Sequence, residues 1–91
     1  MARIRTIKPE FWQDEKVGKL SILARLLFIG MNNFTDDENI IIGNASYLKT
    51  IIFPHDDISG SKIKSCIDEL LNVKFIWPIQ DANGLLYRIM R

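Results

Sequence analysis

The side chains with most potential for chemistry form two acidic clusters, one of them beside a histidine. The first cluster is Asp36-Asp37-Glu38, and the second, Asp56-Asp57, directly follows His55. A calcium loop needs ligands at alternating positions around a central glycine, and neither cluster has that pattern. His55 could act as a general base, but no serine or cysteine lies in a nucleophile motif. We therefore expect turns and helix caps here, and a protein that is not an enzyme.

The single cysteine, Cys66, and the single histidine restrict metal and redox chemistry. One cysteine cannot form an internal disulfide, and these two residues cannot complete a zinc site. We expect no metal and no cofactor, with Cys66 as a small core residue in a reducing compartment. The longest apolar run, Leu26 to Met31, is too short for a membrane span, and no targeting signal is recognisable. These features predict a cytoplasmic protein.

The charges nearly cancel in number but are unevenly distributed. The 91 residues carry 12 basic and 11 acidic side chains, a net charge of +1. The net charge is +3 over residues 1–25, −4 over residues 26–57 and +2 over residues 58–91. A protein that binds nucleic acid without specificity usually has a larger positive charge. The distribution instead predicts a dipolar surface.

Nine residues are candidates for contact with DNA. A helix N-terminus favours a phosphate, lysines reach phosphates or guanine edges, and a basic arm can follow a minor groove. The candidates are Ser61, Lys62, Lys64 and Ser65 at the start of a predicted helix, Arg3, Arg5 and Lys8 on an N-terminal arm, and Lys74 and Arg88 at a predicted hairpin. The alternative for each group is an ordinary solvated surface.

The first predicted helix is apolar on two faces. Ser21 caps it, and apolar residues at helical spacing extend it to about Asn33. Its second apolar face consists of Ile22, Leu26 and Ile29. We expect this face to be covered by residues of the arm, namely Ile7, Phe11 and Trp12. The alternative is an interface in a homodimer.

Two further helices follow a short β-branched strand over residues 40–42. Asn44 caps the second helix, over residues 45–53, and Pro54 stops it. Ser59 or Ser61 caps the third helix, which runs to about Asn72. Its inward stripe is Ile63, Cys66, Ile67, Leu70 and Leu71, and its outward residues are Lys62, Lys64, Ser65, Asp68 and Glu69.

The chain ends in a predicted hairpin. Residues 75–79 and 85–90 favour strands, and Asp81–Gly84 is a turn signal between them. Pro78 cannot donate to a ladder and therefore belongs at a sheet edge or a bulge. The element order predicts an α+β winged helix-turn-helix, one domain over residues 1–91, with an arm over 1–12 and a wing over 75–91. In such folds the third helix enters the major groove.

Several segments resemble the N-terminal winged-helix domain of phage and prophage replication-initiation proteins, the replisome organisers. They are Arg3–Trp12, Asp14-Glu15, Leu23–Gly30, Asp36–Glu38, Ile52–Asp57 and Asp68–Leu70. The resemblance covers nearly the whole chain. It implies binding to double-stranded DNA at an origin and help in loading a helicase, with the helicase or its loader as partner.

Three features depart from the pattern of that family. The second helix keeps one lysine, Lys49, in place of a proline and several basic residues, and Asn39 and Lys74 each replace a glycine. Fewer basic residues mean fewer phosphate contacts. With the acidic central segment, these departures favour an alternative function: a small phage-type protein-interaction module, or an inhibitor of a host nucleic-acid machine such as a defence nuclease.

Overall fold

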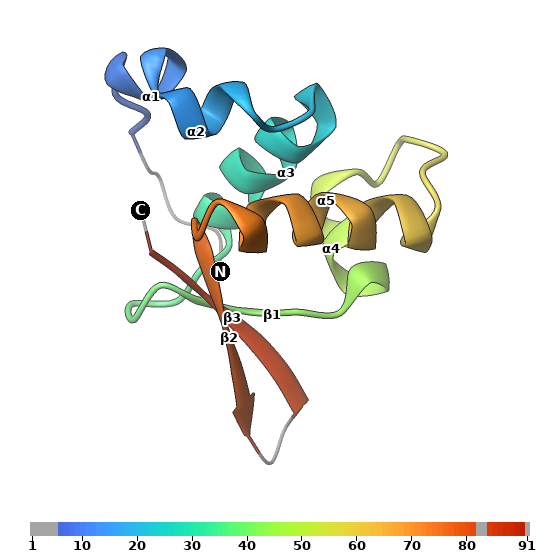
Figure 1. The fold of residues 1–91 in the computed structure, drawn as a ribbon. Coiled ribbons are helices and arrows are strands. Elements are labelled where there is room, and N and C mark those ends of the chain that lie inside the picture. Colours follow the sequence, from blue (N-terminus) through green and yellow to red (C-terminus); the bar gives the residue numbers. More distant parts are fainter. Residues whose placement is uncertain (1–5, 82–83, 91) are drawn as a thin grey trace.

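The computed structural model describes residues 6–81 and 84–90, in which the helices precede the hairpin strands (Figure 1). The elements are α1 (Glu10–Gln13), α2 (Glu15–Gly18), α3 (Ile22–Asn33), β1 (Ile40–Ile42), α4 (Ala45–Ile52), α5 (Gly60–Asn72), β2 (Ile76–Asp81) and β3 (Gly84–Ile89). The three strands form an antiparallel sheet in the order β1-β3-β2. The predicted α+β class is therefore confirmed.

The N-terminal segment is more helical than expected. The predicted arm over residues 1–12 is wrong at its end, because Pro9 has helical dihedrals and leads directly into α1. Phe11 is buried and stacks on Phe28, with the two ring centroids 6.0 Å apart. Trp12, expected on the core, is 54% exposed. The following turn is α2. Asp14 caps it, because the Asp14 carboxylate accepts a hydrogen bond from the backbone N–H of Lys16 at 2.7 Å.

The central helix, α3, is capped as predicted but is not covered as predicted. The Ser21 hydroxyl accepts from the Ala24 N–H at 3.2 Å, as an N-cap does. On its second apolar face Ile22 is 80% exposed and Leu26 is also exposed. A groove of about 380 Å³ near the end of α3 is lined by Ile29 and by described arm residues, namely Thr6, Ile7, Lys8, Glu10 and Phe11. The described part of the arm therefore lies at this end of the face and leaves Ile22 and Leu26 exposed.

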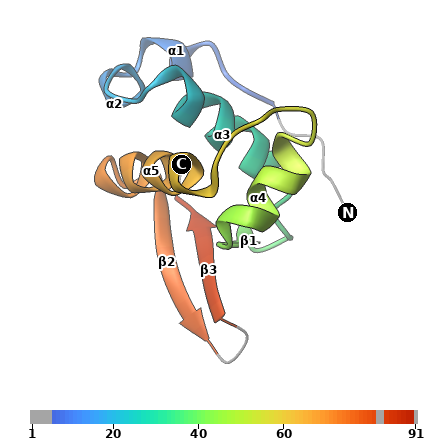
Figure 2. The same ribbon diagram turned by 90° about the vertical axis from the view of Figure 1, so that its right-hand side faces the viewer.

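Helices α4 and α5 pack against each other and against α3 (Figure 2). The side chain of Asn44 caps α4, as predicted, and the cap of α5 is Ser59 rather than Ser61. A methyl group on Gly30 of α3 would lie 2.6 Å from the Ile52 side chain of α4. A helix interior disfavours glycine by about 1 kcal/mol relative to alanine, so this glycine is explained by the close approach of the two helices.

One outward prediction for α5 is wrong. Glu69 is half-buried, and its carboxylate accepts two hydrogen bonds from Ser21: one from the backbone N–H at 2.7 Å and one from the hydroxyl at 2.9 Å. A carboxylate at the N-terminus of α3 also interacts favourably with the helix dipole. Glu69 thereby joins α5 to the start of α3.

The β2–β3 hairpin projects from the helical body, as Figures 1 and 2 both show. Phe75 is buried and stays outside β2, because its N–H donates to the Leu70 carbonyl at 3.1 Å as α5 ends. Pro78 lies in β2, which is an edge strand in the order β1-β3-β2, as predicted. An edge strand tolerates the missing N–H.

Two non-glycine residues among those described adopt left-handed backbone conformations. Asn39 has φ 64° and Lys74 has φ 63°. Asparagine tolerates this region, whereas for a lysine it costs roughly 1–2 kcal/mol. The Lys74 N–H donates to the Leu71 carbonyl at 3.1 Å, so the turn that ends α5 imposes this conformation.

We predict that Lys74→Gly unfolds with a free energy about 1 kcal/mol higher than Lys74→Ala, because glycine adopts this conformation without a steric cost. Chemical denaturation followed by circular dichroism measures the difference. The alanine variant is the matched control, since it removes the same charge but keeps a Cβ atom. Equal stabilities of the two variants would show that the left-handed turn carries no strain.

Candidate nucleic-acid interface

The outward surface of α5 is polar and uncovered. Ser61, Lys62, Lys64 and Ser65 are all exposed, so the structure brings these four predicted site residues together. They are presented outward because the opposite stripe of the helix is buried against α3 and α4; its members are Ile63, Cys66, Ile67 and Leu70. The fifth residue of the predicted stripe, Leu71, is half-buried.

The two lysines do not share one side of this surface. An α-helix turns about 100° per residue, so Ser61 and Ser65 lie roughly 40° apart at its centre. Lys62 and Lys64 lie about 160° apart, one on each flank. The polar surface of α5 is thus a row centred on serines with one cation on either side.

The charges on each flank act on buried groups. Burial and the charge of Glu69 raise the pKa of the Cys66 thiol, while the Ser21 side chain and the charge of Lys62 lower it. On the other flank Asp68 follows Lys64 by one turn. Burial, followed by the charge of Asp68, raises the pKa of Tyr87 on β3 above its ordinary value of 10.0.

A second basic feature lies at the C-terminal end of α5. Lys74 borders a shallow cavity of about 470 Å³ together with Lys16 and Lys19 of the α2 region. We call it the lysine cavity; its other lining residues are Glu69, Asn72 and Val73. Lys74 was predicted as a site residue, but Lys16 and Lys19 were not. Their i, i+3 spacing places them on one side of a helical turn, yet only the fold brings Lys74 to them.

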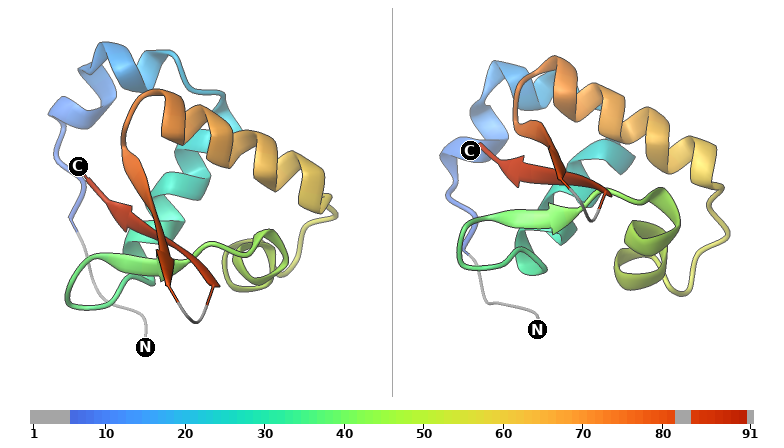
Figure 3. Two further views of the ribbon diagram at one scale, coloured as in Figure 1. Left: turned by 60° about the horizontal axis from the view of Figure 1, so that its bottom comes forward. Right: turned by 90° about the horizontal axis from the view of Figure 1, so that it is seen from below.

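The predicted N-terminal contacts lie elsewhere or outside the described residues. Lys8 is exposed and precedes α1, whereas the start of α5 lies at the opposite end of the domain (Figures 1 and 3). Arg3 and Arg5 lie outside the described residues. Lys8 and the α5 serines and lysines therefore do not form one compact patch.

Arg88 is exposed on β3, in a mostly apolar setting. Paired residues of antiparallel strands present their side chains on the same face, and Arg88 pairs with Ile40 and with Trp77. The next row on that face is Ile42, Leu86 and Ile79. We call these six residues the outer sheet face. Trp77 is 55% exposed and Ile42 is 49% exposed.

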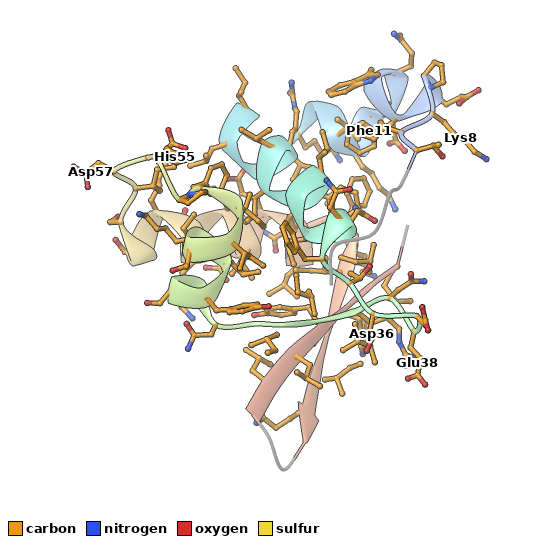
Figure 4. The ribbon with its side chains drawn as sticks, turned by 180° about the vertical axis from the view of Figure 1, so that it is seen from behind. Lys8, Phe11, Asp36, Glu38, His55 and Asp57 are labelled. Carbon is orange, nitrogen blue, oxygen red and sulfur yellow. The ribbon has the colours of Figure 1, made fainter. Side chains whose placement is uncertain are left out.

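The first acidic cluster forms a turn, as expected, whereas the second lies in the loop between α4 and α5 and caps neither helix. The Asp36 carboxylate accepts from the backbone N–H groups of Glu38 at 2.8 Å and Ile40 at 2.9 Å. Figure 4 shows Asp36 and Glu38 at one end of the molecule and His55 and Asp57 at the other. Among the described residues no group of three His, Cys, Asp or Glu side chains is arranged to hold a metal ion.

Cys66 is a core residue, as predicted. It is 1% exposed, and burial, followed by the nearby charge of Glu69, raises the pKa of its thiol above the ordinary value of 9.0. A thiol with a raised pKa stays protonated at neutral pH, and a protonated thiol is a poor nucleophile.

Comparison of the chain with protein-family models, with curated proteins and with solved structures finds no match. Within the described ranges, 6–81 and 84–90, the helices are too short or too polar for any of them to cross a bilayer. A functional proposal therefore depends on the geometry and charge of the surfaces described above.

We expect the native protein to react with a thiol-alkylating reagent at pH 7.5 at least tenfold more slowly than the denatured chain, an order of magnitude typical of buried structural cysteines. Burial raises the pKa of Cys66 in the folded state, so the folded state favours the protonated thiol. This preference contributes to the free energy of unfolding in full below the unfolded pKa, and the contribution declines as the pH rises above about 9. Mass spectrometry of the adduct gives the rate, and the chain in denaturant is the control. Equal rates would place Cys66 at the surface.

Proposed function

We propose that this chain is a winged-helix DNA-binding domain. In this proposal α4 and α5 form the helix-turn-helix unit, α5 enters the major groove and the β2–β3 hairpin is the wing. The element order α3, β1, α4, α5, β2, β3 supports this assignment, as do the packing of α4 on α5 and the projecting hairpin (Figure 2).

The observation that carries the proposal is the uncovered polar surface of α5 with a lysine on each flank. The helix has 13 residues and is about 20 Å long, and the major groove of about 12 Å admits one helix. A helix seated in that groove has a phosphate backbone on either side. Lys62 and Lys64 point to opposite flanks and can therefore reach the two backbones, while Ser61 and Ser65 face the base edges.

The nearly neutral net charge agrees with a modest affinity. A domain with a few phosphate contacts depends on the fit of α5 to its site more than on bulk charge. Asp68, one turn beyond Lys64, places a carboxylate on the same surface and would oppose non-specific binding. The acidic turn around Asp36 lies in the loop between α3 and β1 and is separate from α5.

The biological setting of the proposal comes from the resemblance of the sequence to phage replication initiators. It assigns double-stranded origin DNA as the ligand and a helicase or its loader as a protein partner. The cytoplasmic location expected from the sequence belongs to the same proposal. Contacts from Lys8, Arg88 and the arm arginines Arg3 and Arg5 belong to the same proposal and are secondary to those of α5.

We predict that Lys62→Gln/Lys64→Gln weakens binding to duplex DNA and lowers the slope of log K against log salt by about 2, because each lost phosphate contact removes about 0.9. Fluorescence anisotropy across a salt series measures both quantities. The matched control is Lys62→Arg/Lys64→Arg, which keeps both charges and should keep the slope. If the wild-type chain does not bind duplex DNA at low salt, the proposed function is wrong.

A second candidate function, protein interaction, is favoured by the outer sheet face. Five apolar residues surround one cation, Arg88, on this face. Its two most exposed apolar side chains are about half in contact with solvent. Exposed apolar surface with a polar centre is typical of a protein-binding site. A partner of matching chemistry would offer apolar side chains around a carboxylate.

If this second function holds, Ile42→Thr/Trp77→Thr should lose at least tenfold in affinity for a captured partner, as expected when an exposed aromatic anchor is removed. The same variant should bind DNA within about twofold of wild type, since α5 is unchanged. Threonine is chosen because it preserves strand propensity. Lys62→Gln/Lys64→Gln is the reciprocal control, since it changes α5 and leaves the outer sheet face intact. The capture must be made from nuclease-treated lysate; partners that disappear on this treatment would contradict a direct protein contact.

A further inference from the structure

The lysine cavity is an unassigned concave site with a marked excess of positive charge. It lies between the α2 region and the C-terminal end of α5, and it has a volume of about 470 Å³. Lys16, Lys19 and Lys74 line it, and all three are exposed. Two of these lysines come from one end of the chain and the third from beyond α5, so their convergence is a product of the fold.

The acidic residue of the cavity does not balance these lysines. Glu69 is the single carboxylate among the lining residues. Both of its oxygens accept hydrogen bonds from Ser21, at 2.7 and 2.9 Å. Its charge is therefore directed to the N-terminus of α3, and the cavity keeps a net positive charge. Three cations at one concave site attract an anion more strongly than scattered surface lysines do.

Lys74 stands in a backbone conformation that does not favour lysine. Its φ of 63° lies in the left-handed region, and the hydrogen bond from its N–H to the Leu71 carbonyl holds it there. Backbone strain of this kind is concentrated at functional sites. Here the strained position is also the one that adds the third cation to the cavity.

The cavity lies beside the proposed DNA-binding helix. Lys62 and Glu69 are seven residues apart and share one flank of α5, and Glu69 also lines the cavity. From Lys62 to Asn72, its last residue, the helix rises about 15 Å. This distance is much longer than the spacing of about 3.4 Å between neighbouring phosphates along the duplex axis, so one phosphate cannot contact both Lys62 and the cavity.

We propose that the lysine cavity holds a backbone phosphate of nucleic acid bound along α5, a phosphate other than the one at Lys62. This inference rests on the proposed DNA-binding function. In this inference Lys16, Lys19 and Lys74 form a second phosphate contact. The ligand belongs to the chemical class of phosphodiesters. Asn72, exposed at the same site, supplies an amide that can donate to the phosphate oxygens.

The test compares the 91-residue chain with its Lys16→Gln/Lys19→Gln/Lys74→Gln variant in titrations with a 20-base-pair duplex at several salt concentrations. The triple variant should bind at least fivefold more weakly at low salt, with a slope reduced by about 1, corresponding to one phosphate contact. Arginine at the same three positions is the matched control and should keep the slope. Thermal unfolding of each variant verifies that it folds.

The outcomes separate the inference from the proposed function. No DNA binding by the wild-type chain would overturn both. An unchanged slope in the triple glutamine variant, with a reduced slope in Lys62→Gln/Lys64→Gln, would overturn the cavity assignment alone. A triple variant that loses stability but keeps the slope would show that the lysines only compensate the C-terminal dipole of α5. Inorganic phosphate that shifts the amide signals of Val73 and Lys74 without a change of DNA slope would make the cavity a small-anion site and overturn the nucleic-acid assignment.

Discussion

Burial of one stripe of α5 against α3 and α4 is the constraint on which the rest of the structure depends. Ile63 and Leu70 are fully buried and Cys66 nearly so, which fixes the rotation of the helix about its axis. The opposite surface is then exposed as a necessary consequence of the 3.6-residue period. Because α5 ends in the turn at Lys74 and leads straight into β2, the same packing also determines where the hairpin begins.

The contact between Glu69 and Ser21 extends this constraint to the N-terminal part of the chain. Ser21 caps α3 through its hydroxyl and donates two hydrogen bonds to the carboxylate on α5. Lys19 and Leu20 immediately precede Ser21, and Leu20 is buried. The α2 region is therefore held beside the end of α5. One polar contact thus explains both why an apparently outward glutamate is half-buried and why lysines distant in sequence border one cavity.

The surface of this small domain divides into regions of different chemistry. Each flank of α5 carries a lysine, the lysine cavity is basic, and the outer sheet face is apolar around Arg88. Figure 4 shows Asp36 and Glu38 at the end of the molecule opposite Asp57, which lies in the loop that leads into α5. A net charge of +1 therefore averages over distinct surfaces. Regions of this kind allow a domain to contact a nucleic acid and a protein through separate faces, as the two proposed functions require.

The sequence by itself determined the features that depend on near neighbours. The caps of α3 and α4, the strand at Ile40–Ile42, the hairpin and the edge position of Pro78 were predicted because turns, caps and periodicity act over a few residues. Only the tertiary structure decided that Trp12, Ile22 and Trp77 are exposed, that Glu69 turns toward Ser21, and that Lys16 and Lys19 meet Lys74. An apolar or charged residue shows its chemistry in the sequence, but which distant surface lies against it is set by how the helices and the sheet pack.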